Sequence, residues 1–153
     1  MPPTDPIREL ILQDCAEALW LIDGTGDYHY ALQDVQRGKA VPDDLADLPV
    51  AWVDEGVEAV TRDTNLLLTR TLPVTVEVRL RSAAGDLPTV TNRMLADVER
   101  AMTDDPTRGG LAIRTDMTGN SVIRDESPGV LGSVTVEFEI QYWTLRGNPA
   151  SKG

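Results

Sequence analysis

The sequence predicts an α+β fold in which a mostly antiparallel sheet is flanked by two amphipathic helices. Two segments, about residues 6–21 and 88–103, carry apolar residues at helical spacing. Two others, residues 70–81 and 133–142, alternate between apolar and polar residues as half-buried antiparallel strands do. With 153 residues, 41% hydrophobic and 25% charged, the chain has the usual size and composition of one globular domain.

The first half begins with a helix and continues into strands. The helix over residues 6–21 has one apolar stripe, formed by Ile7, Leu10, Ile11, Cys15, Ala18, Leu19 and Ile22. A short strand is expected near residues 34–38, and a buried one at 50–53. The strand at 70–81 turns its even-numbered apolar residues to the core. Because proline lacks an N–H, Pro73 predicts that this strand begins at a sheet edge.

The second half again sets a helix before strands. After the helix at 88–103, residues 111–117 alternate, and Gly119-Asn120 predicts a turn into a return strand at 122–123, which makes a hairpin. The last strand has an apolar face formed by Val134, Val136, Phe138, Ile140 and Tyr142. We therefore expect one domain over residues 1–145 and, because residues 146–153 have no apolar pattern, a flexible C-terminal tail.

The chain is strongly acidic, and this charge disfavours adhesive DNA binding. It has 14 basic and 25 acidic residues, a net charge of −11, and such a chain repels a phosphate backbone at long range. Residues 43–63 contain seven acidic residues and one basic residue, which gives this segment a net charge of −6. Asp54, Glu55 and Glu58 lie in this zone, which on one interpretation is a surface that repels passing nucleic acid. A solvated surface is the alternative interpretation.

The residue inventory does not favour catalysis. Cys15 is the only cysteine and lies on the apolar stripe of the first helix, where a free thiol packs as a small core side chain. The single histidine, His29, has no neighbours at metal-ligand spacing. Gly24-Thr25-Gly26 follows a helix instead of a strand, so it is a helix stop and not a phosphate loop. We expect no enzyme activity, no catalytic residue, no cofactor and no metal site.

No membrane association is expected either. The N-terminus has no basic region, and no apolar run approaches the roughly 20 residues that a membrane span needs.

Three consecutive leucines, Leu66, Leu67 and Leu68, form a candidate interface. Neighbouring residues of a strand point to opposite faces, so the three cannot share one face. One interpretation is a strand buried on both faces. The other is an apolar segment that becomes buried only on association, because exposed apolar clusters mark interfaces.

Four stretches of the chain have counterparts in one known family. They are the second helix from Met94 to Met102 running into residues 104–111, the strand opening Leu48-Pro49-Val50, the strand over residues 71–78, and the closing strand over residues 134–142. In these stretches and in the order of elements, the chain resembles tail terminator proteins, also called minor tail or tail completion proteins, of tailed bacteriophages and related particles. The resemblance spans roughly residues 5–145 and rests on layout and short similar stretches. The tyrosine-rich segment 28–32 and the leucines at 66–68 depart from it.

The resemblance implies a structural protein of the virion, assembled in the host cytoplasm. Its subunits would form a homo-oligomeric, hexameric ring at the head-proximal end of the tail, which ends tail-tube polymerisation and provides the surface for head–neck attachment. The implied partners are the tail tube protein, the head–neck connector protein and, in a contractile tail, the tail sheath. DNA would pass through a central channel without specific binding, and no membrane would be involved. Our candidates for acids that face this channel are Asp54, Glu55 and Glu58, joined by Glu137 or Glu139. The candidate interface between subunits or with the tube is Leu66, Leu67 and Leu68. No active site is implied.

Two alternatives stay open at this point. One is another head–tail connector or neck protein of the same particle. The other is a small α+β ligand-binding or hydrolase domain, which would be a monomer with a closed polar pocket.

Overall fold

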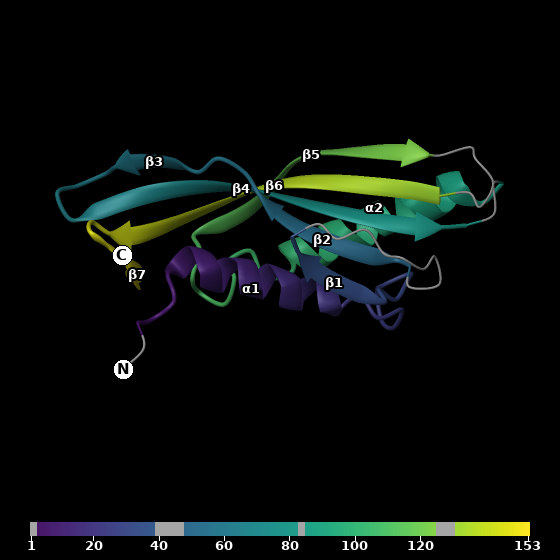
Figure 1. The fold of residues 1–153 in the computed structure, drawn as a ribbon, viewed down its shortest axis with the longest axis horizontal. Helices are drawn as coiled ribbons and strands as arrows, with labels where there is room; N and C mark the ends of the chain where they lie inside the picture. The colour runs from purple at the N-terminus through teal and green to yellow at the C-terminus, as the bar shows by residue number, and fades with distance from the viewer. Residues whose placement is uncertain (1–2, 39–47, 83–84, 125–130) are drawn as a thin grey trace.

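The computed structural model describes residues 3–38, 48–82, 85–124 and 131–153 (Figure 1). Two helices and seven strands form within these residues, and the fold is α+β, as the sequence predicts. In chain order they are α1 (Ile7–Trp20), β1 (Asp34–Arg37), β2 (Val50–Glu55), β3 (Ala59–Arg62), β4 (Leu67–Arg81), α2 (Leu87–Thr103), β5 (Arg114–Arg124), β6 (Leu131–Leu145) and β7 (Asn148–Lys152).

The strands form one sheet around a long central pair. β4 and β6 have 15 residues each and pair antiparallel along their whole length, which corresponds to roughly 50 Å. The sheet order is β1-β2-β4-β6-β5, with β3 also beside β4 and β7 also beside β6. Among these pairs only β1 and β2 run parallel.

The sheet therefore has a body and an arm. In the body, β2 and β5 flank the central pair, and both helices pack on it. In the arm, which we define as residues 59–71 and 141–152, β3 and β7 take over as the outer strands. The outer part of the arm, with the β3–β4 turn, extends beyond both helices (Figure 1).

The core lies between the helices and one face of the body. On β4 the even-numbered residues from Leu72 to Leu80 are at most 2% exposed, and the predicted apolar face of β6 is buried with them. The same cluster contains α1 residues such as Ile11 and Leu19 and α2 residues such as Val98. The predicted helices and both long strands are thus confirmed, as are the short strands near residues 34–38 and 50–53.

Pro73 lies in the middle of the sheet, so the prediction of an edge was wrong. β4 has β6 on one side and β2 and β3 on the other. The carbonyl of Pro73 accepts a hydrogen bond from Gly56 N at 2.8 Å, and the N and C=O of a strand residue point to the same side. The proline nitrogen therefore faces the break between β2 and β3, where a missing N–H removes no ladder hydrogen bond.

Two predictions about the second half were also wrong. Gly119-Asn120 is not a turn, because β5 runs unbroken from Arg114 to Arg124 with a bulge between Met117 and Gly119. A bulge glycine resembles a turn glycine in the sequence. The segment after Arg146, predicted as a tail without regular structure, instead forms β7 against the end of β6.

Candidate functional site

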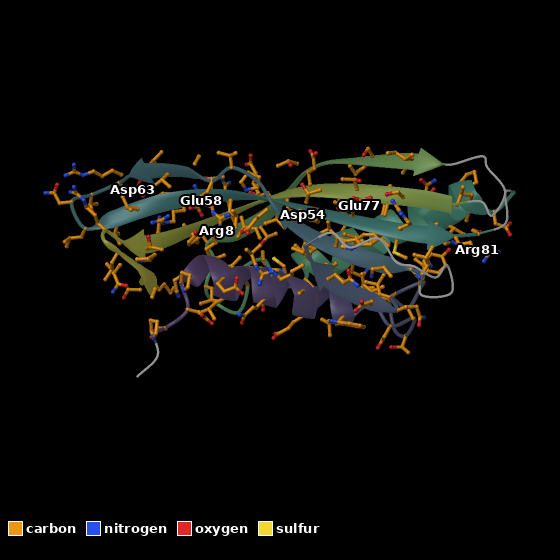
Figure 2. All side chains as sticks on the ribbon, viewed as in Figure 1. Arg8, Asp54, Glu58, Asp63, Glu77 and Arg81 are labelled. Atoms are coloured by element: carbon orange, nitrogen blue, oxygen red, sulfur yellow. The ribbon has the colours of Figure 1, made fainter. Side chains whose placement is uncertain are left out.

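One face of the sheet carries no helix, and acidic residues gather on it. The register sets Asp54 opposite Thr75 and Thr75 opposite Glu137, so the two carboxylates share a row across three strands. Glu139 lies opposite Asp116. We name this surface the acidic face; its charged residues are Asp54, Glu77, Arg79, Arg81, Arg114, Asp116, Glu137 and Glu139, with a net charge of −2. Figure 2 shows Asp54 and Glu77 on it.

The three candidate channel acids have different surroundings. Asp54 is exposed and makes no ion pair with the residues that the structure describes. Glu55 is paired on the surface with Arg8, at 2.8 Å. Glu58 is not a solvated acid, because its side chain is only 9% exposed and lies 3.0 Å from the guanidinium of Arg70. Of the other acids in this zone, Asp43, Asp44 and Asp47 lie outside the described residues.

Glu58 is the centre of an ion-pair cluster at the base of the arm. Arg8 of α1 lies 3.8 Å from it, and the Tyr142 hydroxyl donates a hydrogen bond to its carboxylate. Burial, and then this hydrogen bond, raises the pKa of Tyr142. Figure 2 shows Arg8 and Glu58 close together, with Asp63 farther out on the arm. The cluster joins the start of α1 to β3, β4 and β6, so it fixes the arm relative to the body.

The leucine cluster lies in the arm, where it is not buried on both faces. Leu66 is in the β3–β4 turn and is 71% exposed, whereas Leu67 and Leu68 begin β4 and are half-buried. Trp143 and Leu145 of β6 lie beside them and are 41% and 37% exposed. The arm therefore presents an apolar surface that this chain alone does not cover.

Trp143 and Leu145 were missed by the sequence predictions. They continue the alternation of the last strand, but at odd-numbered positions, where the preceding residues of that strand are polar. Apolar residues on the polar face at the end of a strand were the signal that could have identified them.

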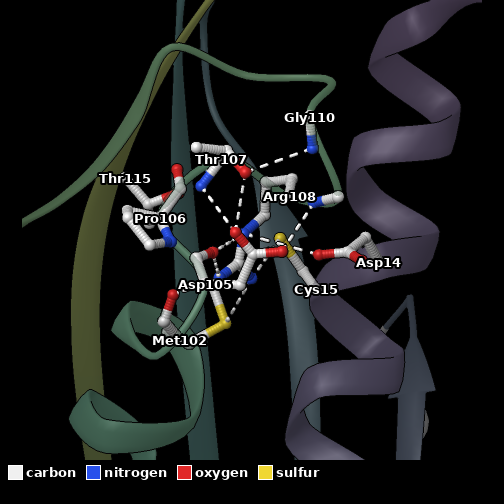
Figure 3. A network of polar contacts seen from close by, with 10 residues as sticks. Asp14, Cys15, Met102, Asp105, Pro106, Thr107, Arg108, Gly110 and Thr115 are labelled. Carbon is white, nitrogen blue, oxygen red and sulfur yellow. Dashed lines mark hydrogen bonds and ion pairs between the residues drawn. The ribbon is translucent and has the colours of Figure 1, made fainter.

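A buried arginine network was also missed (Figure 3). The Arg108 side chain is fully buried, and its guanidinium donates to the backbone carbonyls of Met102 and Asp105. Its Nε lies 3.5 Å from a carboxylate oxygen of Asp14. These contacts tie the turn after α2 to α1. All these partners of Arg108 lie within the fold itself, so we assign the network to the stability of the fold.

The residues considered for catalysis have structural surroundings. Cys15 is fully buried, and desolvation raises the pKa of its thiol to about 11, which opposes formation of the nucleophilic thiolate. His29 is exposed, and its backbone N–H, like that of Tyr30, donates to the buried carboxylate of Asp97. Within the described ranges no three His, Cys, Asp or Glu side chains are grouped to hold a metal ion.

In the part of the chain that the structure describes, no helix is long and apolar enough to cross a membrane.

Comparison with protein-family models gives no match, and comparison with curated proteins gives no significant similarity.

Proposed function

We propose that this protein is a ring-forming tail terminator at the head-proximal end of a phage tail tube. The observation that carries the proposal is the arm. A sheet that is well packed in the body continues past the helices and there exposes leucine and tryptophan side chains. Exposed apolar groups of this kind mark surfaces that another protein covers.

Two further features support the proposal. The carboxylates of the acidic face do not pair with DNA phosphates. They therefore do not cause the counterion release that favours DNA binding. The Glu58 cluster holds the arm firmly to the body, and a rigid arm loses little conformational entropy when it docks. The proposed partners are other copies of the chain in a hexameric ring, the tail tube protein and the head–neck connector protein.

The test is to polymerise the tail tube protein of the same particle with and without this chain. We expect the chain to stop tube growth, which shortens the tubes, and electron microscopy to show a ring at one tube end. Tubes of unchanged length with bare ends would contradict the proposal. A ring found only between the portal and another terminator would instead identify a head–tail connector.

A variant of the arm makes the test specific. Leu66→Asp changes the most exposed of the three leucines, so we expect its melting temperature to stay near that of the wild type while capping is lost. Ile123→Asp is the matched control, because Ile123 is 65% exposed but lies at the far end of β5. Equal loss of capping in both variants would show that the arm has no special role.

A further inference from the structure

The outer arm is basic, although the protein as a whole is acidic. Arg62, Arg146 and Lys152 lie there with a single acid, Asp63, which gives a charge of +2 in a chain of −11. Arg146 and Lys152 make no ion pair with any described residue. The backbone N–H of Arg146 donates to the Leu66 carbonyl at 2.7 Å, so this cation borders the exposed leucine. We name this end of the arm the arm tip; it comprises Arg62, Leu66, Leu67, Trp143, Arg146 and Lys152, with Leu67 and Trp143 on one face of the sheet and Arg62 and Lys152 on the other.

A hollow beside the end of α1 has the opposite character. Its volume is about 400 Å³, and its lining includes the apolar side chains of Leu21 and Tyr28. The charged lining residues are Asp23, Asp27, Asp104 and Arg100. These four lining charges sum to −2, and Asp27 pairs with Arg100 at 3.5 Å.

This hollow is also bordered by apolar groups that the chain leaves uncovered. Leu21 is 55% exposed and Trp20 is 48% exposed, both at the end of α1. The Asp23 carboxylate accepts hydrogen bonds from the hydroxyl and the N–H of Thr25, at 2.6 and 2.9 Å. These bonds lower the pKa of Asp23, so it stays charged at neutral pH.

The arm tip and the hollow complement each other in both charge and apolar character. Each has a central exposed leucine, with cations around Leu66 and carboxylates around Leu21. Within one chain the two surfaces lie far apart along the long axis (Figure 1), so an arm cannot reach the hollow of its own body. A second copy of the chain supplies an acidic hollow for the arm tip and a cationic arm tip for the hollow.

We propose that the arm tip of one copy docks on the α1 hollow of the next copy. Such a contact joins two different surfaces and is therefore heterologous, and heterologous contacts close into rings when the rotation between subunits permits. The inference rests on the proposed function, because it names the contact through which the ring forms. It also explains why cations gather on the arm of an acidic protein.

The first experiment measures the native mass of the purified chain by sedimentation velocity over a range of concentrations. We expect association that Arg146→Glu and Asp104→Lys each weaken at least about tenfold, since both place like charges across the contact. The double variant, in which the two charges are exchanged, is expected to recover part of the loss. Ile123→Asp is the control and should associate like the wild type.

The second experiment mixes two defective variants. Leu66→Asp has a defective arm tip and an intact hollow, whereas Leu21→Asp has the reverse. Each variant alone should stay monomeric, and their mixture should form one-to-one pairs that grow no further. Unchanged melting temperatures would show that both variants fold.

Three results would overturn the inference: a wild-type chain that stays monomeric at every concentration, single variants that associate like the wild type, or a mixture without pairs. None of these decides whether the chain caps tubes, because the tube-length measurement is separate. Conversely, uncapped tubes together with arm-to-hollow pairs would leave the contact standing and remove the tail-terminator function.

Discussion

At the scale of single residues, three acids within five positions of the sequence have three environments. Asp54 is solvated on the acidic face, Glu55 is paired with Arg8 at the surface, and Glu58 is partly buried against Arg70 and Tyr142. An exposed ion pair contributes at most about 1 kcal/mol, whereas breaking a buried pair leaves a desolvated charge without compensation. The same substitution should therefore have very different effects at these positions.

We predict that Glu58→Lys lowers the free energy of unfolding by up to about 3 kcal/mol, because it places a third cation beside Arg8 and Arg70 in a partly buried site. Asp54→Lys should change it by no more than about 0.5 kcal/mol. Urea unfolding of both variants measures the difference. Similar stabilities would mean that the cluster does not hold the arm.

These environments could not be predicted from the local sequence. Glu58 meets Arg8 from a helix 50 positions earlier and Tyr142 from a strand 84 positions later. The sequence around Arg108 did not indicate that its side chain is buried, because an arginine in a turn is expected to be exposed. Its burial depends on contacts with Cys15 and Met102. By contrast, the burial of Cys15 followed directly from the apolar stripe of α1.

At the scale of elements, alternation identified the strands wherever one face packs on helices. That condition holds in the body, where β4 alternates between buried and half-buried residues. It fails in the arm, where β4 continues to Leu67 without a helix beneath it and the pattern fades. The arm and β7 were therefore not predicted, whereas the helices and the long strands of the body were.

The start of α2 lies close to the sheet at Gly132. A Cβ added there would lie 3.0 Å from Leu87, 3.2 Å from Thr91 and 3.3 Å from Leu80. We predict that Gly132→Ala pushes the start of α2 away from the sheet and lowers the free energy of unfolding by about 1–3 kcal/mol.

Gly85→Ala is the matched control for this prediction, because a Cβ at Gly85 would have no atom of the described residues outside its chain neighbours within 4 Å. Its stability should equal or slightly exceed that of the wild type, since alanine restricts the unfolded chain. Thermal unfolding of both variants tests the argument. Equal melting temperatures would show that the shift of α2 does not lower the stability of the protein.

At the scale of the whole molecule, the charges are sorted by surface. The helix-free side of the body is acidic, whereas the arm tip carries cations. If the arm tips dock on neighbouring copies, assembly covers these cations and leaves the acidic face as the surface that DNA meets. The sequence predicted that Glu137 or Glu139 joins the acids near residue 54, and the strand register places both glutamates on the same face as Asp54.

We therefore predict that Asp54→Lys slows DNA ejection from particles assembled with the variant, by at least about twofold, because a ring of lysines pairs with phosphate. The slowing should fade as salt rises, since ion pairing with DNA depends on counterion release. Glu99→Lys is the control: it makes the same change in net charge on the exposed side of α2. If Glu99→Lys slows ejection equally, net charge and not the acidic face governs passage, and if neither variant does, the acidic face does not line the channel.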